Sequence, residues 1–171
     1  IVWFKRDLRL SDHAPLKLAE EAGLPTLLLY VFEPMQMYDS HYSERHWRFV
    51  TESLVDIHRM ISGKVSVANS ILLEVLSEVI QHYQIDSIFS YQETGLANTF
   101  ARDKSVSKWL YEQSINWVES QTAAVVRPCN NRDSWDQHWQ QVMKGSLIDN
   151  QLSKLNLIQY KFDTSKLPDC W

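Results

Sequence analysis

The sequence predicts an α/β protein with a Rossmann-like, doubly wound fold: a five-stranded parallel sheet with helices on both faces, followed by an interdomain linker. Short apolar runs alternate along the chain with segments whose apolar residues recur every three or four positions, a pattern typical of strands alternating with amphipathic helices. One run, residues 27–32 (LLLYVF), is apolar at every position. Central strands of parallel sheets have this composition because helices cover both of their faces.

The first elements follow from this alternation. Residues 1–4 (IVWF) are a short apolar run bounded by charge, and we expect a buried strand there. A helix should follow, with Asp12 as its N-cap, Pro15 in its first turn and Gly23 at its end. Residues 27–32 then form the second strand.

A long helix is expected next, beginning after a cap at Asp39, Ser40 or Ser43 and ending near Gly63. Its apolar stripe consists of Trp47, Val50, Leu54, Ile57 and Ile61. A short third strand is expected at residues 65–67.

The alternation then continues through a helix from Ser70, a strand at residues 86–91, a helix at residues 98–113 and a strand at residues 115–118. One more helix is expected at residues 132–143. After it the chain is polar and weakly periodic. We therefore assign residues 1–120 to an α/β domain and residues 121–171 to its end and a linker, and expect this sequence to be a piece of a longer chain.

Composition limits the function classes. The net charge of −4 argues against a nucleic-acid clamp, because phosphate binding relies on clustered basic residues. Cys129 and Cys170 are far apart and form no CxxC pair, and the six histidines show no metal-ligand spacing. No apolar run approaches the roughly 20 residues of a membrane span, and no signal-peptide pattern is present. We expect a cytoplasmic protein without a membrane partner.

Ligands of open α/β sheets bind beyond the carboxyl ends of the strands, which directs attention to residues 5–13, 33–42 and 91–98. These loops contain neither a dinucleotide-binding glycine pattern nor a P-loop. Arg6 offers a guanidinium that either pairs with neighbouring carboxylates or contacts a ligand. Asn98 is either a helix N-cap or a ligand contact.

These residues carry a family likeness. The stretch VWFKRDLRLSDHAPL (residues 2–16) resembles the opening of the DNA photolyase and cryptochrome family, with Asp12-His13 where that family usually has Asp-Asn. FEP at residues 32–34, and YQETG followed by ARD between residues 91 and 103, occur in the family's order. The likeness extends over essentially the whole chain, but it covers only the family's N-terminal α/β domain.

The resemblance implies the partners and cofactors. In full-length relatives a C-terminal helical domain, absent from this chain, binds FAD and faces the lesion in UV-damaged DNA. The α/β domain of many members binds a light-harvesting antenna, either methenyltetrahydrofolate or an 8-hydroxy-deazaflavin. The parent protein is then expected to be a lyase, a deoxyribodipyrimidine photolyase that uses blue light and reduced FAD for DNA repair, although this part lacks the catalytic domain.

Both antennas have candidate contacts. Folate-using members contact the pterin through an Asn-Glu pair before ARD; this sequence has Asn98-Thr99 there, so the amide is kept, the carboxylate is lost, and Glu93 is the nearest substitute. Deazaflavin-type members use the loops after the second and fourth strands. The full set of cofactor candidates is Arg6, Phe32, Glu33, Pro34, Met35, Tyr91, Glu93 and Asn98.

Two other functions fit the same residues. A cryptochrome photoreceptor without repair activity differs from a photolyase only in the absent domain. A stand-alone α/β module that binds an adenosine nucleotide and has a regulatory role has the same strand pattern, since a fold alone does not determine function.

Overall fold

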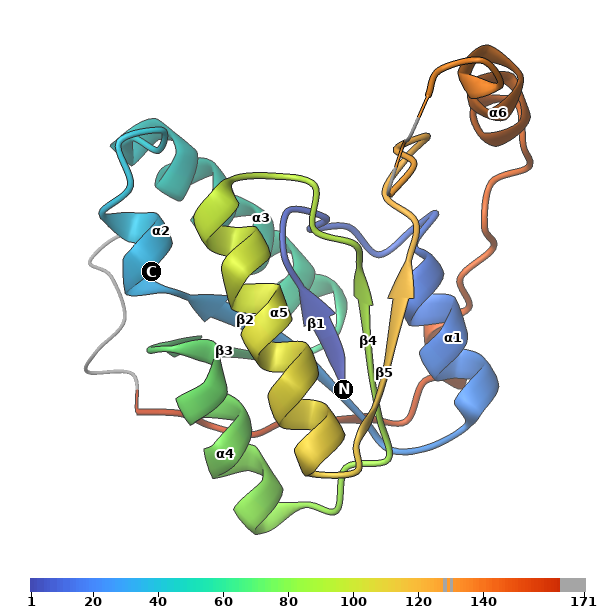
Figure 1. Cartoon of the computed structure of the whole chain (residues 1–171). Coiled ribbons are helices and arrows are strands. Elements are labelled where there is room, and N and C mark those ends of the chain that lie inside the picture. Colours follow the sequence, from blue (N-terminus) through green and yellow to red (C-terminus); the bar gives the residue numbers. More distant parts are fainter. Residues whose placement is uncertain (128, 130, 164–171) are drawn as a thin grey trace.

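The protein was analysed as a computed structural model, which describes residues 1–127, 129 and 131–163. Its centre is a parallel sheet in the order β3-β2-β1-β4-β5 (Figure 1). The strands are β1 (Val2–Phe4), β2 (Thr26–Phe32), β3 (Val65–Asn69), β4 (Ser87–Tyr91) and β5 (Asn116–Ser120). The predicted fold class is confirmed.

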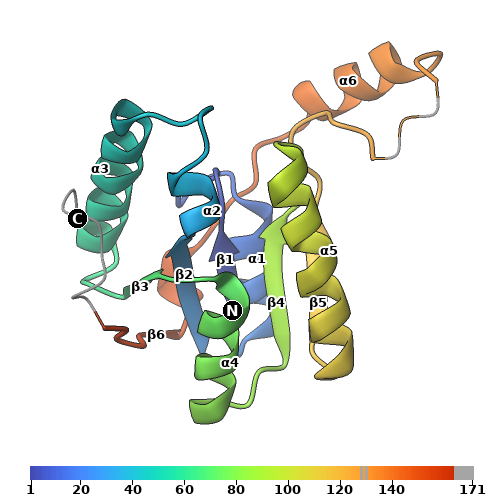
Figure 2. The ribbon, with the colours of Figure 1, turned by 60° about the vertical axis from the view of Figure 1, so that its left-hand side comes forward.

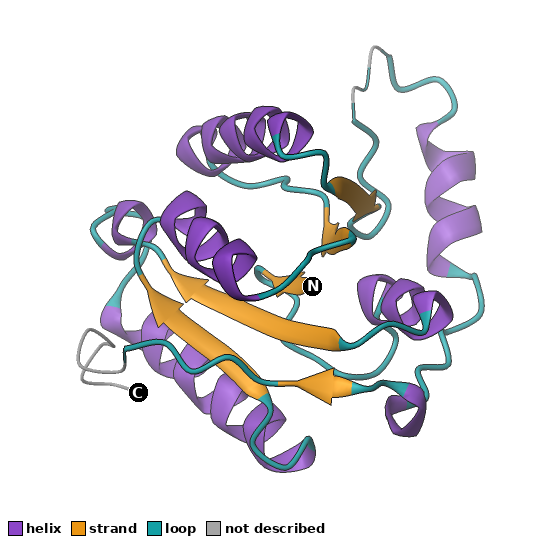
Figure 3. Ribbon diagram, turned by 90° about the horizontal axis from the view of Figure 1, so that it is seen from below, coloured by secondary structure: helices purple, strands orange, loops and turns teal. Residues whose placement is uncertain are grey.

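Helices cover both faces of this sheet (Figure 2, Figure 3). They are α1 (Ala14–Ala22), α2 (Pro34–Met37), α3 (Glu44–Met60), α4 (Leu72–His82), α5 (Ala97–Glu112) and α6 (Trp135–Met143). None of the described helices is long and apolar enough to cross a membrane.

Alternating residues of β2 divide the core into two layers. Leu27, Leu29 and Val31 pack against α4 and α5, whereas Leu28 and Tyr30 pack against α1 and α3. All seven residues of β2 are buried. This burial explains the continuous apolar run, because side chains on both faces of a central strand meet helices.

Two helix starts differ from the prediction. The N-cap of α1 is His13 rather than Asp12: His13 Nδ1 accepts a hydrogen bond from the N–H of Leu16 at 3.2 Å. Asp12 has a φ of 50°, and its carboxylate instead accepts from the backbone N–H of Ile148 at 3.0 Å. Asn98 lies inside the first turn of α5, whose N-cap is Leu96.

The segment after β5 leaves the sheet and returns to it. Helix α6 stands away from the body of the molecule in Figure 1, and none of its residues is buried. The chain then passes a short 3-10 helix, η1 (Leu152–Lys154), and adds a two-residue strand, β6 (Leu157–Ile158), parallel to the start of β2. Phe162 is buried in the core. The segment from Ile148 to Phe162 therefore contacts the α/β unit. The assignment of residues 121–171 to the end of the domain and a linker stays a prediction.

Candidate functional site

The loops after β1, β2 and β4 meet at the carboxyl edge of the sheet. β1 pairs with β2 on one side and with β4 on the other, so the exits of the first and fourth strands are adjacent. The strand order reverses between β1 and β4. This is the position at which open α/β sheets bind ligands.

Arg102 on α5 is the centre of a buried ion-pair network at this edge. Its guanidinium contacts Glu33 at the end of β2, Glu93 after β4 at 3.2 Å and its neighbour Asp103 at 2.8 Å. All four side chains are less than 10% exposed. Burial raises the pKa of Glu33 above its ordinary value, since removal from water disfavours the carboxylate more than Arg102 stabilises it. Arg102 thus directs both predicted ligand carboxylates inward.

Two residues after β1 complete the network. Lys5 Nζ lies 2.6 Å from Asp103 and 4.3 Å from the centre of the Trp3 ring. Burial lowers the pKa of Lys5 despite the attraction of Asp103. Arg6 Nη2 lies 2.5 Å from Glu93, but its side chain is 51% exposed. The carboxylates are therefore inside the protein, and the guanidinium of Arg6 reaches the surface.

Gly95 makes room for the Arg6–Glu93 pair. A Cβ atom at this position would lie 2.7 Å from Glu93 Oε1 and 2.8 Å from Arg6 Nη1, closer than side-chain carbons approach such atoms. The backbone N–H of Gly95 also donates to Glu93 Oε1 at 2.6 Å. A side chain at this position would displace the guanidinium of Arg6 from Glu93.

His13 and Asp7 close the loop that carries Arg6. The His13 ring is fully buried, and its Nε2 lies 2.6 Å from Asp7 Oδ2. Because Nδ1 accepts the helix-capping hydrogen bond, the ring proton is on Nε2 and is donated to Asp7. The other Asp7 oxygen accepts from the N–H of Lys5 at 2.8 Å. Asp7 and His13 are thereby committed to internal contacts.

One cavity, which we call the α3 cavity, lies between the loop after β1 and helix α3. It has a volume of about 630 Å³. Its aromatic walls are Tyr30, Tyr42, Trp47 and Phe49. The basic residues around it are Lys5, Arg6, Arg9, Arg45 and His46, and Asp7 is its one acidic lining residue. The rings of Tyr42 and Trp47 are stacked, with centroids 5.0 Å apart. Burial raises the pKa of both Tyr30 and Tyr42, so their hydroxyls remain protonated donors.

A second cavity, the switch crevice, lies between the ends of β1 and β4 and has a volume of about 680 Å³. Arg6, Arg9 and Tyr91 form its floor, and residues 142–148 form its roof. Tyr91 accepts hydrogen bonds from the N–H of Ala14 at 2.9 Å and from Arg9 at 3.2 Å. Lys5, Arg6, Asp7 and Arg9 line both cavities, which therefore adjoin.

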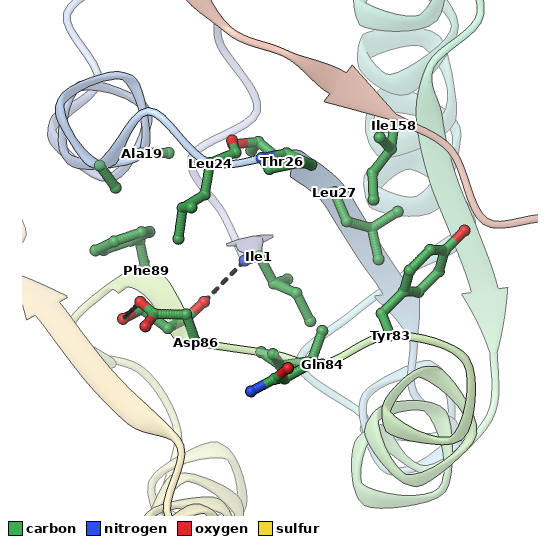
Figure 4. A pocket seen from close by; sticks show the side chains of 14 residues that line it. Ile1, Ala19, Leu24, Thr26, Leu27, Tyr83, Gln84, Asp86, Phe89 and Ile158 are labelled. Atoms are coloured by element: carbon green, nitrogen blue, oxygen red, sulfur yellow. Dashed lines mark hydrogen bonds between the residues drawn. The ribbon is translucent and has the colours of Figure 1, made fainter.

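A third, smaller pocket lies at the opposite edge, where the strands begin. It has a volume of about 220 Å³ and is walled mainly by apolar side chains, among them Ile1, Leu27 and Phe89 (Figure 4). Among the residues that line this pocket, Asp86 is the one with a charged side chain. It is remote from the ion-pair network and offers little chemistry.

Three of the eight predicted cofactor residues line one or both of the two cavities, and five do not. Arg6 lines both cavities, and Tyr91 and Glu93 line the switch crevice. The other five candidates line neither cavity: Phe32 is fully buried in the core, Glu33 binds Arg102, Pro34 and Met35 lie on α2, and Asn98 donates to Asp39 at 2.8 Å.

Of the residues that line the α3 cavity, the predicted cofactor candidates included only Arg6; the residues that sequence reasoning missed include Tyr30, Tyr42, Arg45 and Phe49. The signal was present in the sequence, because aromatic and basic residues alternate around the start of the long helix (YSERHWRF, residues 42–49).

The family follows from comparison with known proteins. The family model described as DNA photolyase matches residues 1–143. The chain belongs to the DNA photolyase family. Among curated relatives, the cryptochrome DASH of Synechocystis sp. is 28% identical over 101 residues, which are 54% of this chain and 21% of the relative. The deoxyribodipyrimidine photo-lyase of Alkalihalophilus pseudofirmus is 24% identical over 135 residues, 74% of this chain and 27% of the relative.

Solved structures show the same fold. The Synechocystis cryptochrome superposes with a TM-score of 0.70 at 18% identity, covering 98% of this chain and 40% of that protein. The archaeal photolyase of Sulfolobus tokodaii gives 0.69 at 18% identity, covering 95% and 38%. The class III photolyase of Agrobacterium tumefaciens gives 0.66 at 21% identity, covering 78% and 28%. The chain thus spans between about a fifth and two fifths of the length of these relatives.

Proposed function

We propose that this chain is the antenna-binding α/β domain of a blue-light flavoprotein that repairs UV-induced pyrimidine dimers, and that the α3 cavity holds the antenna. The observation that carries this proposal is the pairing of aromatic walls with basic residues in one cavity of about 630 Å³. Cofactor sites are typically apolar clefts of about 300–1,000 Å³ with a few placed polar groups.

The cavity favours a flavin-like or deazaflavin-like ring over a folate. Tyr42 and Trp47 present stacked rings against which a planar ring system packs. Arg45, which lines this cavity and not the switch crevice, presents donors to its carbonyl and hydroxyl oxygens. A pterin needs a carboxylate to accept from its amino group, and Glu33 and Glu93 are both bound by Arg102. The Sulfolobus tokodaii photolyase, which shares this fold, contains two FAD molecules and has been connected with a novel light-harvesting cofactor.

In this proposal the domain orients a chromophore, and a flavin domain performs the chemistry. The bound antenna absorbs light and transfers its excitation energy to FAD in a C-terminal domain of the same protein. Helices and strands around the cavity are rigidly packed, which fixes the distance and angle of the two chromophores. UV-damaged DNA is then a partner of the full-length protein rather than of this domain.

A cryptochrome without repair activity is the second candidate. It is supported by the similarity to the Synechocystis cryptochrome DASH and to the structure of a cryptochrome from the same organism. Both candidates use the same antenna site in this domain. Repair of a dimer-containing oligonucleotide under blue light by the full-length protein distinguishes them.

The antenna is tested by absorbance of the full-length protein supplied with a deazaflavin. We expect near-ultraviolet or blue absorbance beyond that of FAD. Phe49→Ala removes a wall of the α3 cavity that is 70% exposed, so it should lower chromophore retention without loss of folding. Tyr111→Ala, at a side chain 86% exposed on α5 and outside the α3 cavity, is the matched control. A flavin-only spectrum after supplementation, or equal retention in the two variants, would refute the assignment of the cavity.

A further inference from the structure

The switch crevice adjoins the proposed antenna cavity, with which it shares Lys5, Arg6, Asp7 and Arg9, and it has the dimensions of a ligand site. Its volume is about 680 Å³, within the range of about 300–1,000 Å³ typical of small-molecule pockets. It lies between the ends of β1 and β4, where the strand order reverses. Parallel α/β sheets bind ligands there because both exits leave a gap that no crossover helix covers.

Three basic residues (Lys5, Arg6 and Arg9) and three acidic residues (Asp7, Asp12 and Glu93) line the crevice. Lys5, Asp7 and Glu93 are buried and paired inside the protein, so the guanidinium groups of Arg6 and Arg9 are its most exposed charged groups. Arg6 is 51% exposed, while its partner Glu93 is 2% exposed. Arg9 is exposed and donates to the backbone carbonyl of Asp12 rather than to a carboxylate. The Asp12 carboxylate also lines the crevice, but one of its oxygens accepts from the N–H of Ile148. Guanidinium groups at a solvent-accessible floor suit a phosphate, which they bind with several hydrogen bonds.

The other walls of the crevice present polar uncharged and apolar side chains rather than guanidinium groups. Gln92, Thr94 and Gln121 supply amide and hydroxyl groups along one side. Met143 and Leu147 in the roof are 53% and 80% exposed. Apolar side chains at that exposure are stabilised when a planar group covers them, and methionine makes favourable contacts with aromatic rings. The crevice therefore has one wall for an anion and one for a flat ring with polar edges.

The roof is attached to the floor by hydrogen bonds. The backbone N–H of His13 donates to Asn150 Oδ1 at 2.7 Å, and Asn150 Nδ2 donates back to the His13 carbonyl at 2.9 Å. Together with the Ile148–Asp12 bond, these contacts connect the roof to the start of α1. A preformed crevice lowers the ordering cost of binding.

From this juxtaposition we propose that the switch crevice is a second ligand site, distinct from the antenna cavity, which binds a nucleotide. The phosphate contacts Arg6 and Arg9, and the base lies under Met143 with its polar edge toward Gln92 and Gln121. Nothing in this inference depends on the identity of the antenna.

The test is calorimetric titration of the full-length protein, with its bound cofactors retained, using AMP as the probe. Adenosine, ribose 5-phosphate and inorganic phosphate represent parts of the ligand. We expect AMP to bind at least about tenfold more tightly than any of these parts, since both walls then contribute. Thr94→Glu places a carboxylate beside Arg6 and should weaken AMP binding about tenfold or more. Met143→Ala should weaken AMP binding while leaving ribose 5-phosphate unaffected.

Two control variants make the result specific. Ser107→Glu adds the same charge at an exposed position of α5 outside both cavities and should leave AMP binding unchanged. Val50→Trp fills the α3 cavity and should also leave it unchanged. AMP binding no tighter than that of phosphate, or unaffected by Thr94→Glu, overturns the proposal. Loss of AMP binding in Val50→Trp alone would assign the nucleotide to the α3 cavity and would also overturn the proposal. The proposed antenna function is tested separately by absorbance.

Discussion

Replacing Arg102 with methionine tests the ion-pair network, because it removes the one cation that reaches three carboxylates. Glu93 would keep Arg6 and the N–H of Gly95, and Asp103 would keep Lys5. Glu33 would keep only a long 3.4 Å hydrogen bond from the N–H of Leu72. The cost therefore falls mainly on Glu33, whose side chain is 4% exposed.

The expected loss is about 3–5 kcal/mol in the free energy of unfolding, the usual effect of removing one partner from a buried ion pair. Its pH dependence follows from the raised pKa of Glu33. A buried carboxyl whose folded pKa exceeds its unfolded value binds its proton more tightly in the folded state, so its contribution to stability is present at low pH and is lost as pH rises through the folded pKa. Loss of Arg102 raises that pKa further. The variant should be least stable, relative to the native protein, at pH 8 and recover toward pH 5.

Urea unfolding followed by circular dichroism at several pH values provides the measurement. Adding Glu33→Gln to Arg102→Met should restore part of the stability, because the uncompensated charge is gone. Arg59→Met, which removes a surface pair whose side chains are 75% and 71% exposed, is the control and should change stability by less than about 0.5 kcal/mol. A loss below about 1 kcal/mol in Arg102→Met, or no recovery in the double variant, would show that the network does not stabilise this edge.

Three further outcomes are expected. Gly95→Ala should displace the half-exposed guanidinium of Arg6 from Glu93 and lower the free energy of unfolding by about 1 kcal/mol or less, because the displaced group is the end of a flexible side chain; an unchanged chemical shift of the Arg6 side chain would contradict this. His13→Ala removes both the cap of α1 and the donor to Asp7, so it should lower the free energy of unfolding by about 2–4 kcal/mol. His13→Asn should recover about 1 kcal/mol of this loss, because its side-chain oxygen can cap the helix. Equal unfolding midpoints for the two variants would be inconsistent with the capping role. In a filter-retention assay the isolated chain should hold UV-irradiated and undamaged duplex equally, since its net charge is −4; preferential retention of irradiated duplex would locate lesion recognition in this domain.

The sequence by itself determined the fold class and the order of the five central strands and the longer helices, although not the short α2 and β6. The apolar run of β2 and the three- and four-residue spacing in α3 are local patterns, and local patterns are sufficient to assign strands and helices and to infer parallel crossovers. The stretch around Arg6 and the later ARD sequence were also sufficient to indicate the family. These conclusions needed no knowledge of which side chains touch.

The tertiary structure alone decided which candidates face a cavity. Arg102 pairs with Glu33 across 69 positions, Arg6 with Glu93 across 87, and Lys5 with Asp103 across 98. The local sequence around a carboxylate that follows a strand is the same whether that carboxylate faces a ligand or pairs with a buried arginine. The distinction depends on contacts between distant segments, and these are set by the packing of the whole sheet rather than by neighbours along the chain. For the same reason the return of residues 146–162 to β2 was not visible in their weak periodicity.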